Sequence, residues 1–375
     1  MTKIVLLTAT VQSHICQFHK PLVEVLHSHG CEVHVAARDN LEEKNGLKLD
    51  FVDRVYDVPF SRSPKSADNL KAYRQLKRIL KETHYDVVHC NTPMGGIVTR
   101  LSAREARRSG TKVFYTAHGF HFYKGAPKKN WILFYPIEKA FSRITDKLIT
   151  ITAEDYALAS RKFSCPTERI HGVGVDEERY FPVSDDEKLR LRKDMGFSPG
   201  QKILLCVGEL LPNKNQIMAI HMMERIATRY PDALLLLAGN GPEKENLERE
   251  IVACGMENNV RMLGYCTHLQ DYQHIADALV SCSRREGLPL NIVEAMLSGT
   301  PVVAADNRGH RELIRDGGNG YLVPQDDGGA MAEKVLDLLA DRELAAGIID
   351  AAAAQAAAYG FRNVKRELEK IYFPQ

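Results

Sequence analysis

Two carboxylates eight residues apart, Glu286 and Glu294, flank a predicted loop-to-helix junction. Pro289 is typical of the first turn of a helix, and Gly299 followed by Pro301 is typical of its end. The free N–H groups at a helix N-terminus attract anions. Acidic side chains beside them therefore suggest a ligand with phosphate at its centre and hydroxyls at both ends, as in a nucleotide-diphosphate sugar. The alternative is that Glu294 only complements the helix dipole and that Glu286 is a solvated loop residue.

A lysine that could neutralise such a diphosphate is Lys214. It follows a predicted buried strand, residues 202–208, after a turn at Gly208, and it opens a predicted helix. An ammonium group there can face phosphate as a point charge. The alternative is a solvated lysine at a helix start.

Several other turns after predicted strands contain glycine, and ligands of open α/β sheets bind at such turns. One spans residues 239–242 and another is Gly264-Tyr265-Cys266. A Gly-x-Gly pair is weak evidence, because any tight turn can use it. His118 and His121 follow the predicted strand 112–116 on a glycine-flanked loop. A structural histidine is the alternative for each.

The run from Glu286 to Met296, taken with Ser298 to Ala304, resembles the signature of the family 4 retaining glycosyltransferases of the GT-B type. The family motif is Glu, seven residues, Glu, and both ends are present. The resemblance is most specific over residues 172–323 and recognisable over 111–156. It implies an α/β fold with two Rossmann-like, doubly wound parallel-sheet domains facing a central cleft.

The resemblance also implies roles for individual residues. Glu286, Lys214 and His118 would be catalytic: Glu286 would hold sugar hydroxyls, Lys214 would stabilise the leaving diphosphate, and His118 would contact the donor sugar near its reactive face. Glu294 would accept both ribose hydroxyls, because a carboxylate is an acceptor with two oxygens. The other expected nucleotide-sugar-binding residues are Gly208, Tyr265, Leu288, Leu290, Asn291, Arg284, Arg285, Ser13 and His14.

The sequence departs from the family pattern in two loops. Glu209 stands where the family usually has Arg, so either Arg284 or Arg285 supplies the missing charge, or Lys214 and the amides of helix 290–298 suffice. The loop 9–15 lacks the Gly-Gly of many relatives, although Ser13 and His14 can offer hydrogen bonds to phosphate or acceptor.

We predict no metal site, because the chain has no Asp-x-Asp and no other ligand cluster with suitable spacing. We also expect no cofactor apart from the nucleotide-sugar donor, which is a substrate and expected to be UDP-linked.

The length of 375 residues favours two domains. We place an acceptor-side domain at residues 1–170, with a helix at 359–375 crossing back onto it, and a nucleotide-sugar-binding domain at 171–358. The eight cysteines lack any Cys-x-x-Cys and are predicted to be reduced core thiols. No apolar run is long enough to span a membrane, and residues 2–8 form a first strand with too short an apolar stretch for a signal peptide, so we expect a cytoplasmic protein.

Hydrophobic periodicity predicts alternating strands and helices in each half. Predicted strands lie at 3–8, 32–37, 55–58, 87–90, 112–116, 147–152, 203–208, 233–238, 259–263, 278–282 and 301–305. Predicted helices lie at 16–29, 68–83, 214–229, 242–254, 268–276, 290–298, 343–358 and 361–371, with a polar connector at 185–200.

Charge is divided unevenly. Residues 1–170 hold 27 Lys+Arg against 17 Asp+Glu, a net charge of +10, whereas the remainder holds 23 against 31, a net charge of −8. A basic N-terminal half suggests reversible contact with an anionic membrane or a lipid-linked diphosphate rather than with nucleic acid. Residues 124–136 place lysines before an aromatic cluster, as interfacial segments do. The alternative is a core helix at 131–144.

The sequence therefore predicts a retaining, metal-independent hexosyl- or N-acetylhexosaminyltransferase. The acceptor would be a hydroxyl of a lipid-linked or surface glycan, as in polysaccharide biosynthesis, at the inner face of the cell membrane. A nucleotide-sugar 2-epimerase of similar architecture is one alternative. A non-catalytic nucleotide-sugar-binding subunit is another, suggested only by Glu209.

Overall fold

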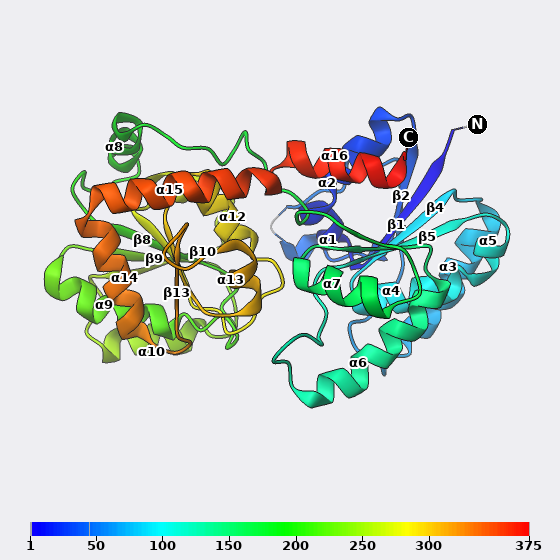
Figure 1. Cartoon of the computed structure of the whole chain (residues 1–375), viewed down its shortest axis with the longest axis horizontal. Helices are drawn as coiled ribbons and strands as arrows, with labels where there is room; N and C mark the ends of the chain where they lie inside the picture. Colours follow the sequence, from blue (N-terminus) through cyan, green and yellow to red (C-terminus); the bar gives the residue numbers. More distant parts are fainter. Residues whose placement is uncertain (1, 45, 375) are drawn as a thin grey trace. The chain divides into compact units, whose positions relative to one another are not determined.

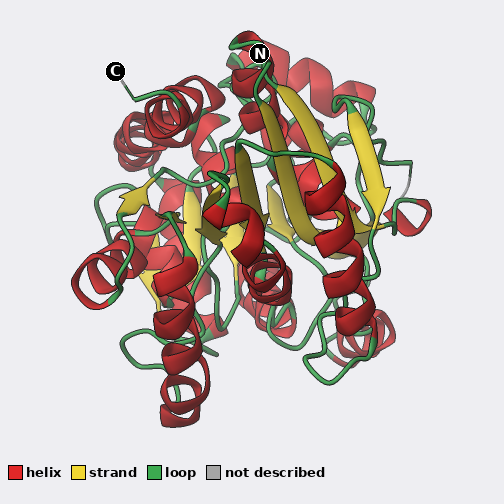
Figure 2. Ribbon diagram, turned by 90° about the vertical axis from the view of Figure 1, so that its right-hand side faces the viewer, coloured by secondary structure: helices red, strands yellow, loops and turns green. Residues whose placement is uncertain are grey.

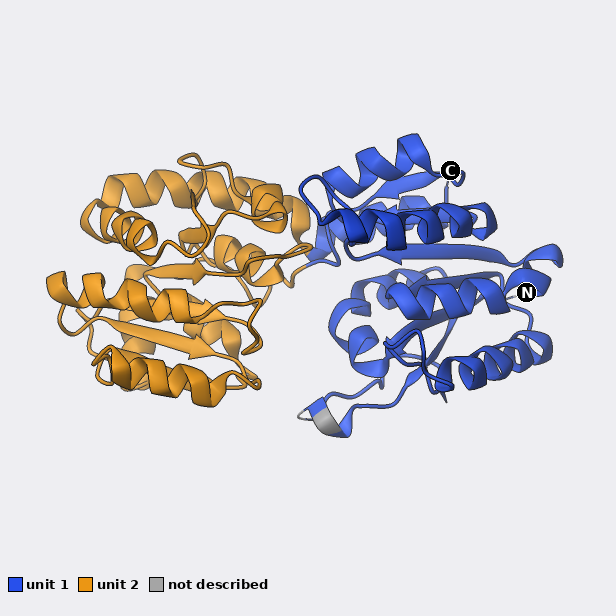
Figure 3. Cartoon of the chain, turned by 90° about the horizontal axis from the view of Figure 1, so that it is seen from below, with its two compact units in different colours: residues 1–174, 361–375 blue, residues 175–360 orange. Residues whose placement is uncertain are grey.

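The computed structural model describes residues 2–44 and 46–374. Contacts within the chain divide it into two units (Figure 3): residues 1–174 with 361–375 form unit 1, and residues 175–360 form unit 2. The sequence predicted domain boundaries after residues 170 and 358, and the contacts place them after residues 174 and 360.

Unit 1 is built on a parallel sheet of seven strands in the order β3-β2-β1-β4-β5-β6-β7. Strand β1, which lies inside the sheet between β2 and β4, is buried over nearly its whole length, as expected when helices cover both faces of a parallel sheet. Figure 2 shows helices on either side of the strands. The strands are β1 Ile4–Val11, β2 Glu32–Arg38, β3 Arg54–Asp57, β4 Val87–Asn91, β5 Lys112–Ala117, β6 Lys147–Thr150 and β7 Thr167–Arg169.

The helices of unit 1 include one from the end of the sequence. Helix α16 packs on α2 (Figure 1), and within unit 1 the Tyr372 hydroxyl hydrogen-bonds His89 Nδ1 at 2.5 Å. The α-helices are α1 Gln12–Phe18, α2 Lys20–Ser28, α3 Asp68–Glu82, α4 Pro93–Ser102, α5 Arg104–Arg108, α6 Lys128–Phe141, α7 Ala153–Lys162 and α16 Phe361–Tyr372; the short 3-10 turns are η1 Glu42–Lys44 and η2 Ser142–Ile144.

The single helix predicted over 16–29 is wrong. Two helices, α1 and α2, meet at His19, whose backbone leaves the helical region at φ −120° and ψ 6°. Pro21 lies in the first turn of α2, where its missing N–H costs nothing. The break fixes His19 at a junction between helices.

Unit 2 contains a second parallel sheet, of six strands in the order β10-β9-β8-β11-β12-β13. The two sheets confirm the predicted pair of doubly wound, Rossmann-like domains. The strands are β8 Ile203–Val207, β9 Leu234–Ala238, β10 Val260–Gly264, β11 Ala278–Ser281, β12 Val302–Ala305 and β13 Tyr321–Val323.

The polar connector predicted at 185–200 is wrong, because residues 185–194 form helix α8. Ser184 caps it by accepting a hydrogen bond from the Glu187 N–H, and Arg192 is buried against Asp277 at 2.8 Å. Polar contacts thus replace the apolar stripe that marks a helix in sequence. The helices of unit 2 are α8 Asp185–Asp194, α9 Ile217–Arg229, α10 Lys244–Ala253, α11 Leu269–Ile275, α12 Leu290–Leu297, α13 Arg308–Leu313, α14 Gly328–Ala340 and α15 Arg342–Ala356, followed by η3 Ala357–Tyr359.

Each sheet reverses its strand order once, between β1 and β4 in unit 1 and between β8 and β11 in unit 2. Ligands of doubly wound sheets bind outside the carboxyl ends of the strands at this switch point. The loops after β1 and β4, and those after β8 and β11, are therefore the places to look for a site.

No helix in residues 2–44 and 46–374 combines the length and apolar character that crossing a membrane requires.

Candidate functional site

Lys214 and Glu286 meet at the switch point of unit 2, one on the loop after β8 and the other on the loop after β11. Lys214 Nζ lies 2.6 Å from Glu286 Oε1, and the two side chains are 25% and 14% exposed. The lysine stem crosses Gly208, where an added Cβ would lie 3.4 Å from Lys214 Cδ. Helix α9 begins at Ile217, so Lys214 precedes the helix that it was predicted to open. The structure thus brings the Lys214 ammonium group, the Glu286 carboxylate and the backbone of Gly208, which has no side chain, close together.

Helix α12 begins beside this pair. Pro289 is its N-cap residue, with an extended backbone, and does not lie in the first turn as predicted. Asn291 Nδ2 donates to the Val207 carbonyl at 3.1 Å, which ties the start of α12 to the end of β8. Leu288 and Leu290 pack against the hydrophobic core below. The N-terminal amides of α12 are thereby held close to Gly208 and can bind an anion.

Gly309, in the first turn of α13, is a positioning residue that the sequence motifs do not reveal. A Cβ at Gly309 would lie 2.6 Å from Glu286 Cβ and 2.9 Å from the Glu286 carbonyl oxygen. The Asn307 side chain accepts hydrogen bonds from the Gly309 and His310 N–H groups, which fixes this turn. Only glycine lets α13 approach Glu286 so closely.

Glu294 lies in the second turn of α12 and is partly buried. Burial raises the pKa of its carboxyl from 4.5 to about 7, against opposing effects of the Arg179 charge and a hydrogen bond with the Tyr180 side chain. A carboxyl that can ionise near neutral pH and hydrogen-bond a hydroxyl is suited to a ribose diol.

The raised pKa of Glu294 predicts that free protein loses stability as pH rises. The folded state holds this proton more tightly than the unfolded chain, so the stabilisation is complete below about pH 4.5 and is lost as pH rises through about 7. We expect a loss of about 2–3 kcal/mol relative to Glu294→Gln. Urea unfolding of both proteins between pH 4.5 and 8 measures this loss. If the free energy of unfolding changed with pH in the same way in both proteins, the raised pKa of Glu294 would be contradicted.

Three other residues predicted to bind the donor are either exposed or held by other contacts. The Arg284 guanidinium is held by Asp326 at 2.7 Å and by the Pro212 carbonyl at 2.8 Å. Arg285 is exposed. Tyr265 follows β10 and is 44% exposed. If Arg284 is to supply the positive charge that is missing at Glu209, its guanidinium must leave Asp326.

The Gly239–Gly241 turn has a packing role. A Cβ at Gly239 would lie 1.9 Å from the Gly208 carbonyl oxygen, and one at Gly241 would lie 2.3 Å from the Leu210 carbonyl oxygen. These glycines therefore support the loop that carries Lys214 from below.

A second group of predicted residues gathers at the switch point of unit 1. His118 follows β5 and His14 follows β1, and their Nε2 atoms lie 3.3 Å apart. Asn91, at the end of β4, places its Oδ1 3.2 Å from His118 Nε2. Ser13 is tied to Asn40, whose Oδ1 accepts the Ser13 N–H at 3.1 Å and whose amide donates to the Ser13 hydroxyl.

His19 belongs to the same group, although sequence spacing gives no sign of it. Its ring lies edge-on to the His118 ring, with centroids 5.7 Å apart, and is tilted against the His14 ring, with centroids 5.2 Å apart. Burial lowers the pKa of His118 to about 4 and the pKa values of His14 and His19 well below 6.5, so all three are neutral at physiological pH. His121 points elsewhere and stacks on Phe134 at 4.7 Å.

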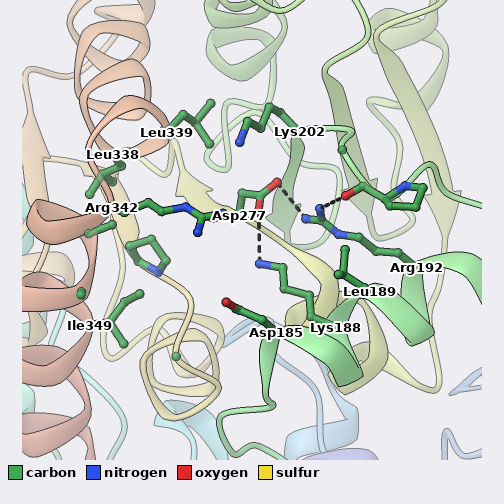
Figure 4. A pocket seen from close by; sticks show the side chains of 16 residues that line it. Asp185, Lys188, Leu189, Arg192, Lys202, Asp277, Leu338, Leu339, Arg342 and Ile349 are labelled. Carbon is green, nitrogen blue, oxygen red and sulfur yellow. Dashed lines mark hydrogen bonds and ion pairs between the residues drawn. The ribbon is translucent and has the colours of Figure 1, made fainter.

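A pocket of about 510 Å³ in unit 2 lies at the opposite, amino-terminal ends of the strands (Figure 4). Asp277 holds Lys188 at 3.2 Å and Arg192 at 2.8 Å there, and Lys202 and Arg342 line the same pocket. No residue predicted to bind the donor lines it.

The aromatic cluster predicted to face outward packs inward, and the alternative of a helix packed on the core holds for one face of α6, which spans Lys128–Phe141. Trp131 and Tyr135 pack inward on Phe122, with ring centroids 5.6 and 5.5 Å apart. Ile132 and Leu133, on the opposite side of α6, are 77% and 60% exposed. The apolar residues that face outward are therefore aliphatic.

The comparisons with known proteins agree with this architecture. Residues 21–179 match the family model described as Glycosyltransferase Family 4, and residues 187–355 match the one described as Glycosyl transferases group 1.

Two curated relatives span most of the chain. EpsD of Bacillus subtilis (strain 168), which carries the name of a glycosyltransferase, is 44% identical over 92% of this chain and 89% of its own. The UDP-Gal:alpha-D-GlcNAc-diphosphoundecaprenol alpha-1,3-galactosyltransferase of Escherichia coli is 25% identical over 88% of this chain and 86% of its own.

Among solved structures, Anabaena HepE in complex with UDP superposes with a TM-score of 0.79 at 20% identity, covering 99% of both chains. HepE has also been solved with UDP-glucose, at a TM-score of 0.77. This likeness establishes the shared fold.

Proposed function

Because the chain belongs to the family 4 glycosyltransferases of the GT-B fold, we propose that it transfers a sugar, with retention, from a UDP-linked donor to a hydroxyl of a lipid-linked glycan. The observation that carries the proposal is the Lys214–Glu286 pair beside the α12 N-terminus. These groups supply the charges that a leaving diphosphate and a sugar hydroxyl need.

In this proposal, donor binding breaks the ion pair between Lys214 and Glu286, and each side chain then contacts the donor instead. Lys214 turns from Glu286 to the diphosphate, aided by the α12 amides, and stabilises the charge that grows as the anomeric C–O bond breaks. Glu286, released, accepts hydrogen bonds from sugar hydroxyls, and His118 contacts the sugar. The acceptor oxygen bonds to the anomeric carbon on the face that the phosphate leaves. Its proton passes to a phosphate oxygen.

A UDP donor is supported by two comparisons. HepE binds UDP and UDP-glucose in solved structures, and the Escherichia coli relative is named for UDP-Gal. The raised pKa and hydroxyl partner of Glu294 suit the ribose. The name of the same relative, a diphosphoundecaprenol transferase, supports a lipid-linked acceptor.

Thermal-shift screening against UDP-, GDP- and ADP-sugars tests the donor. We expect stabilisation by one or more UDP-sugars and by UDP, with little effect of GDP or ADP compounds. Transfer is then assayed with and without a polyprenyl-diphosphate glycan. Release of an epimerised sugar nucleotide in the absence of acceptor would favour the epimerase alternative.

We expect transfer to need no divalent ion, so activity should survive excess chelator. Within the described part of the chain, two groups of side chains could hold a metal, and neither includes Glu286 or Glu294. Lys214 and the α12 amides would act where a divalent ion does in other transferases. Activity after dialysis against a chelator measures this; inactivation rescued by Mg²⁺ or Mn²⁺ would contradict it.

We further propose reversible binding of unit 1 to anionic membrane through α6. Lys128 and Lys129 are exposed beside the outward-facing Ile132 and Leu133. Each basic residue near an anionic surface contributes about 1 kcal/mol, screened by salt. Lys128→Glu/Lys129→Glu should reduce co-sedimentation with anionic vesicles at low salt. Reversing Lys193 and Lys244 in unit 2 is the matched control, and equal binding by both double variants would leave α6 as ordinary surface.

A further inference from the structure

Three histidines far apart in sequence meet in unit 1: His14, His19 and His118. One nitrogen from each lies within 4.8 Å of the others. The group sits where α1 meets α2 and where β5 ends, so the fold, rather than any local motif, assembles it.

One distance in this group matches metal ligation. Zinc binds imidazole nitrogen at about 2.0–2.1 Å with tetrahedral angles, which puts two ligand nitrogens about 3.3–3.4 Å apart. His14 Nε2 and His118 Nε2 are 3.3 Å apart. An ordinary N–H···O or N–H···N bond is shorter on average.

The third member has an unused nitrogen. His19 is 4% exposed, and its Nε2 is buried without a hydrogen-bond partner. Leaving such an atom unpaired is costly, and buried polar atoms are nearly always paired in folded proteins. The neighbouring His89 differs, because both of its nitrogens are engaged, by Tyr372 and Thr116.

The surroundings suit a cation held by neutral ligands. Imidazole binds metal in its neutral form. Three histidines with an open fourth position are a common zinc set. The charged side chain that acts on His14 is Arg62, which is exposed and well screened. Asn91 Oδ1 faces His118 Nε2 and would lose its donor when a metal takes that nitrogen.

We propose that His14, His19 and His118 form a Zn²⁺ site, and that zinc bound there inhibits transfer by withdrawing His118 and His14 from the donor. The inhibitory part rests on the proposed function, whereas metal binding does not. Zinc would thus be an inhibitor of an enzyme that needs no metal for its chemistry.

The test uses the full chain carrying His221→Ala, because His221, Glu250 and Cys254 form the other group that could hold a metal. Zinc titration by calorimetry should give one equivalent per chain. His19→Phe keeps an aromatic ring in place but removes the ligand, and should weaken binding more than about 100-fold, beyond the loss seen for groups that only orient ligands. His84→Ala, a change at an exposed histidine, should not alter it. If His19→Phe misfolds by circular dichroism, His19→Leu replaces it.

Absence of stoichiometric binding, or equal binding by His19→Phe, would overturn the site while leaving the proposed function intact. Cobalt substitution adds a spectroscopic check, because a thiolate charge-transfer band would show a cysteine ligand and overturn the assignment to three histidines. In the transfer assay, zinc should compete with the donor in the parent protein and not in His19→Phe. Binding without inhibition would uphold the metal site and overturn the role of His118 in transfer.

Discussion

Lys214→Ala should reduce turnover by 10²–10³-fold in a protein that still folds. The variant removes the cation beside the α12 N-terminus, and a leaving diphosphate without it should lose about 3–4 kcal/mol of transition-state stabilisation, as when an oxyanion donor is deleted. Steady-state kinetics with the donor found by thermal shift measures the loss. Folding should persist because Lys214 is partly exposed and the core beneath it is unchanged.

Two further variants make this result specific. Lys244→Ala removes an exposed lysine of the same unit and should leave turnover unchanged. Glu286→Gln should also reduce turnover, and the double variant should lose less than the sum, because the two side chains touch. Near-normal turnover of Lys214→Ala would remove this lysine from the site and shift the diphosphate to Arg284 or Arg285.

Glu138→Ala should destabilise unit 1 by about 3–5 kcal/mol, because it leaves the buried Arg100 charge without a partner. Arg100 is 2% exposed, and its Nη2 lies 3.0 Å from Glu138 Oε2. The guanidinium lies between the rings of Tyr115 and Phe141, 4.1 and 4.8 Å from their centroids. Urea unfolding monitored by Trp131 fluorescence measures the change.

A surface pair provides the comparison. Glu105→Gln breaks the ion pair with Lys77 on the exterior of the same unit and should have no measurable effect. Arg100→Met/Glu138→Leu should regain most of the stability lost in Glu138→Ala, since a buried pair replaced by apolar groups needs no charge compensation. A small loss in Glu138→Ala would mean that water reaches Arg100 once the carboxylate is gone.

Periodicity predicted the central strands of both sheets well, because continuous apolar runs such as residues 203–207 have one interpretation between glycine turns. It failed for α8, whose buried face is made by Arg192 and its polar partners instead of an apolar stripe. Helices α13 and α14 and the edge strand β13 were not predicted either. The edge strand is only three residues long and too short to show a period.

In the candidate site, too, some residues could be predicted from the sequence and others could not. Glu286, Lys214 and Glu294 could be proposed from sequence, because their spacing matches a family signature. Gly309 could not, because its role is to leave room for Glu286, which lies on another loop. Nor could His19, whose partner His118 is remote in sequence. Contacts between distant segments carry no local signal, so only the folded chain reveals them.

The discontinuity of unit 1 has a consequence for biosynthesis. Its sheet is formed by residues 1–174, but α16 is synthesised after the whole of unit 2. This helix packs on α2, and its Tyr372 hydroxyl hydrogen-bonds His89. At about 5–20 residues per second, a ribosome needs roughly 10–40 s to travel from one part to the other. Unit 2 is continuous and can finish folding first. During that interval the nascent unit 1 lacks α16, so the face of α2 that α16 will cover stays uncovered.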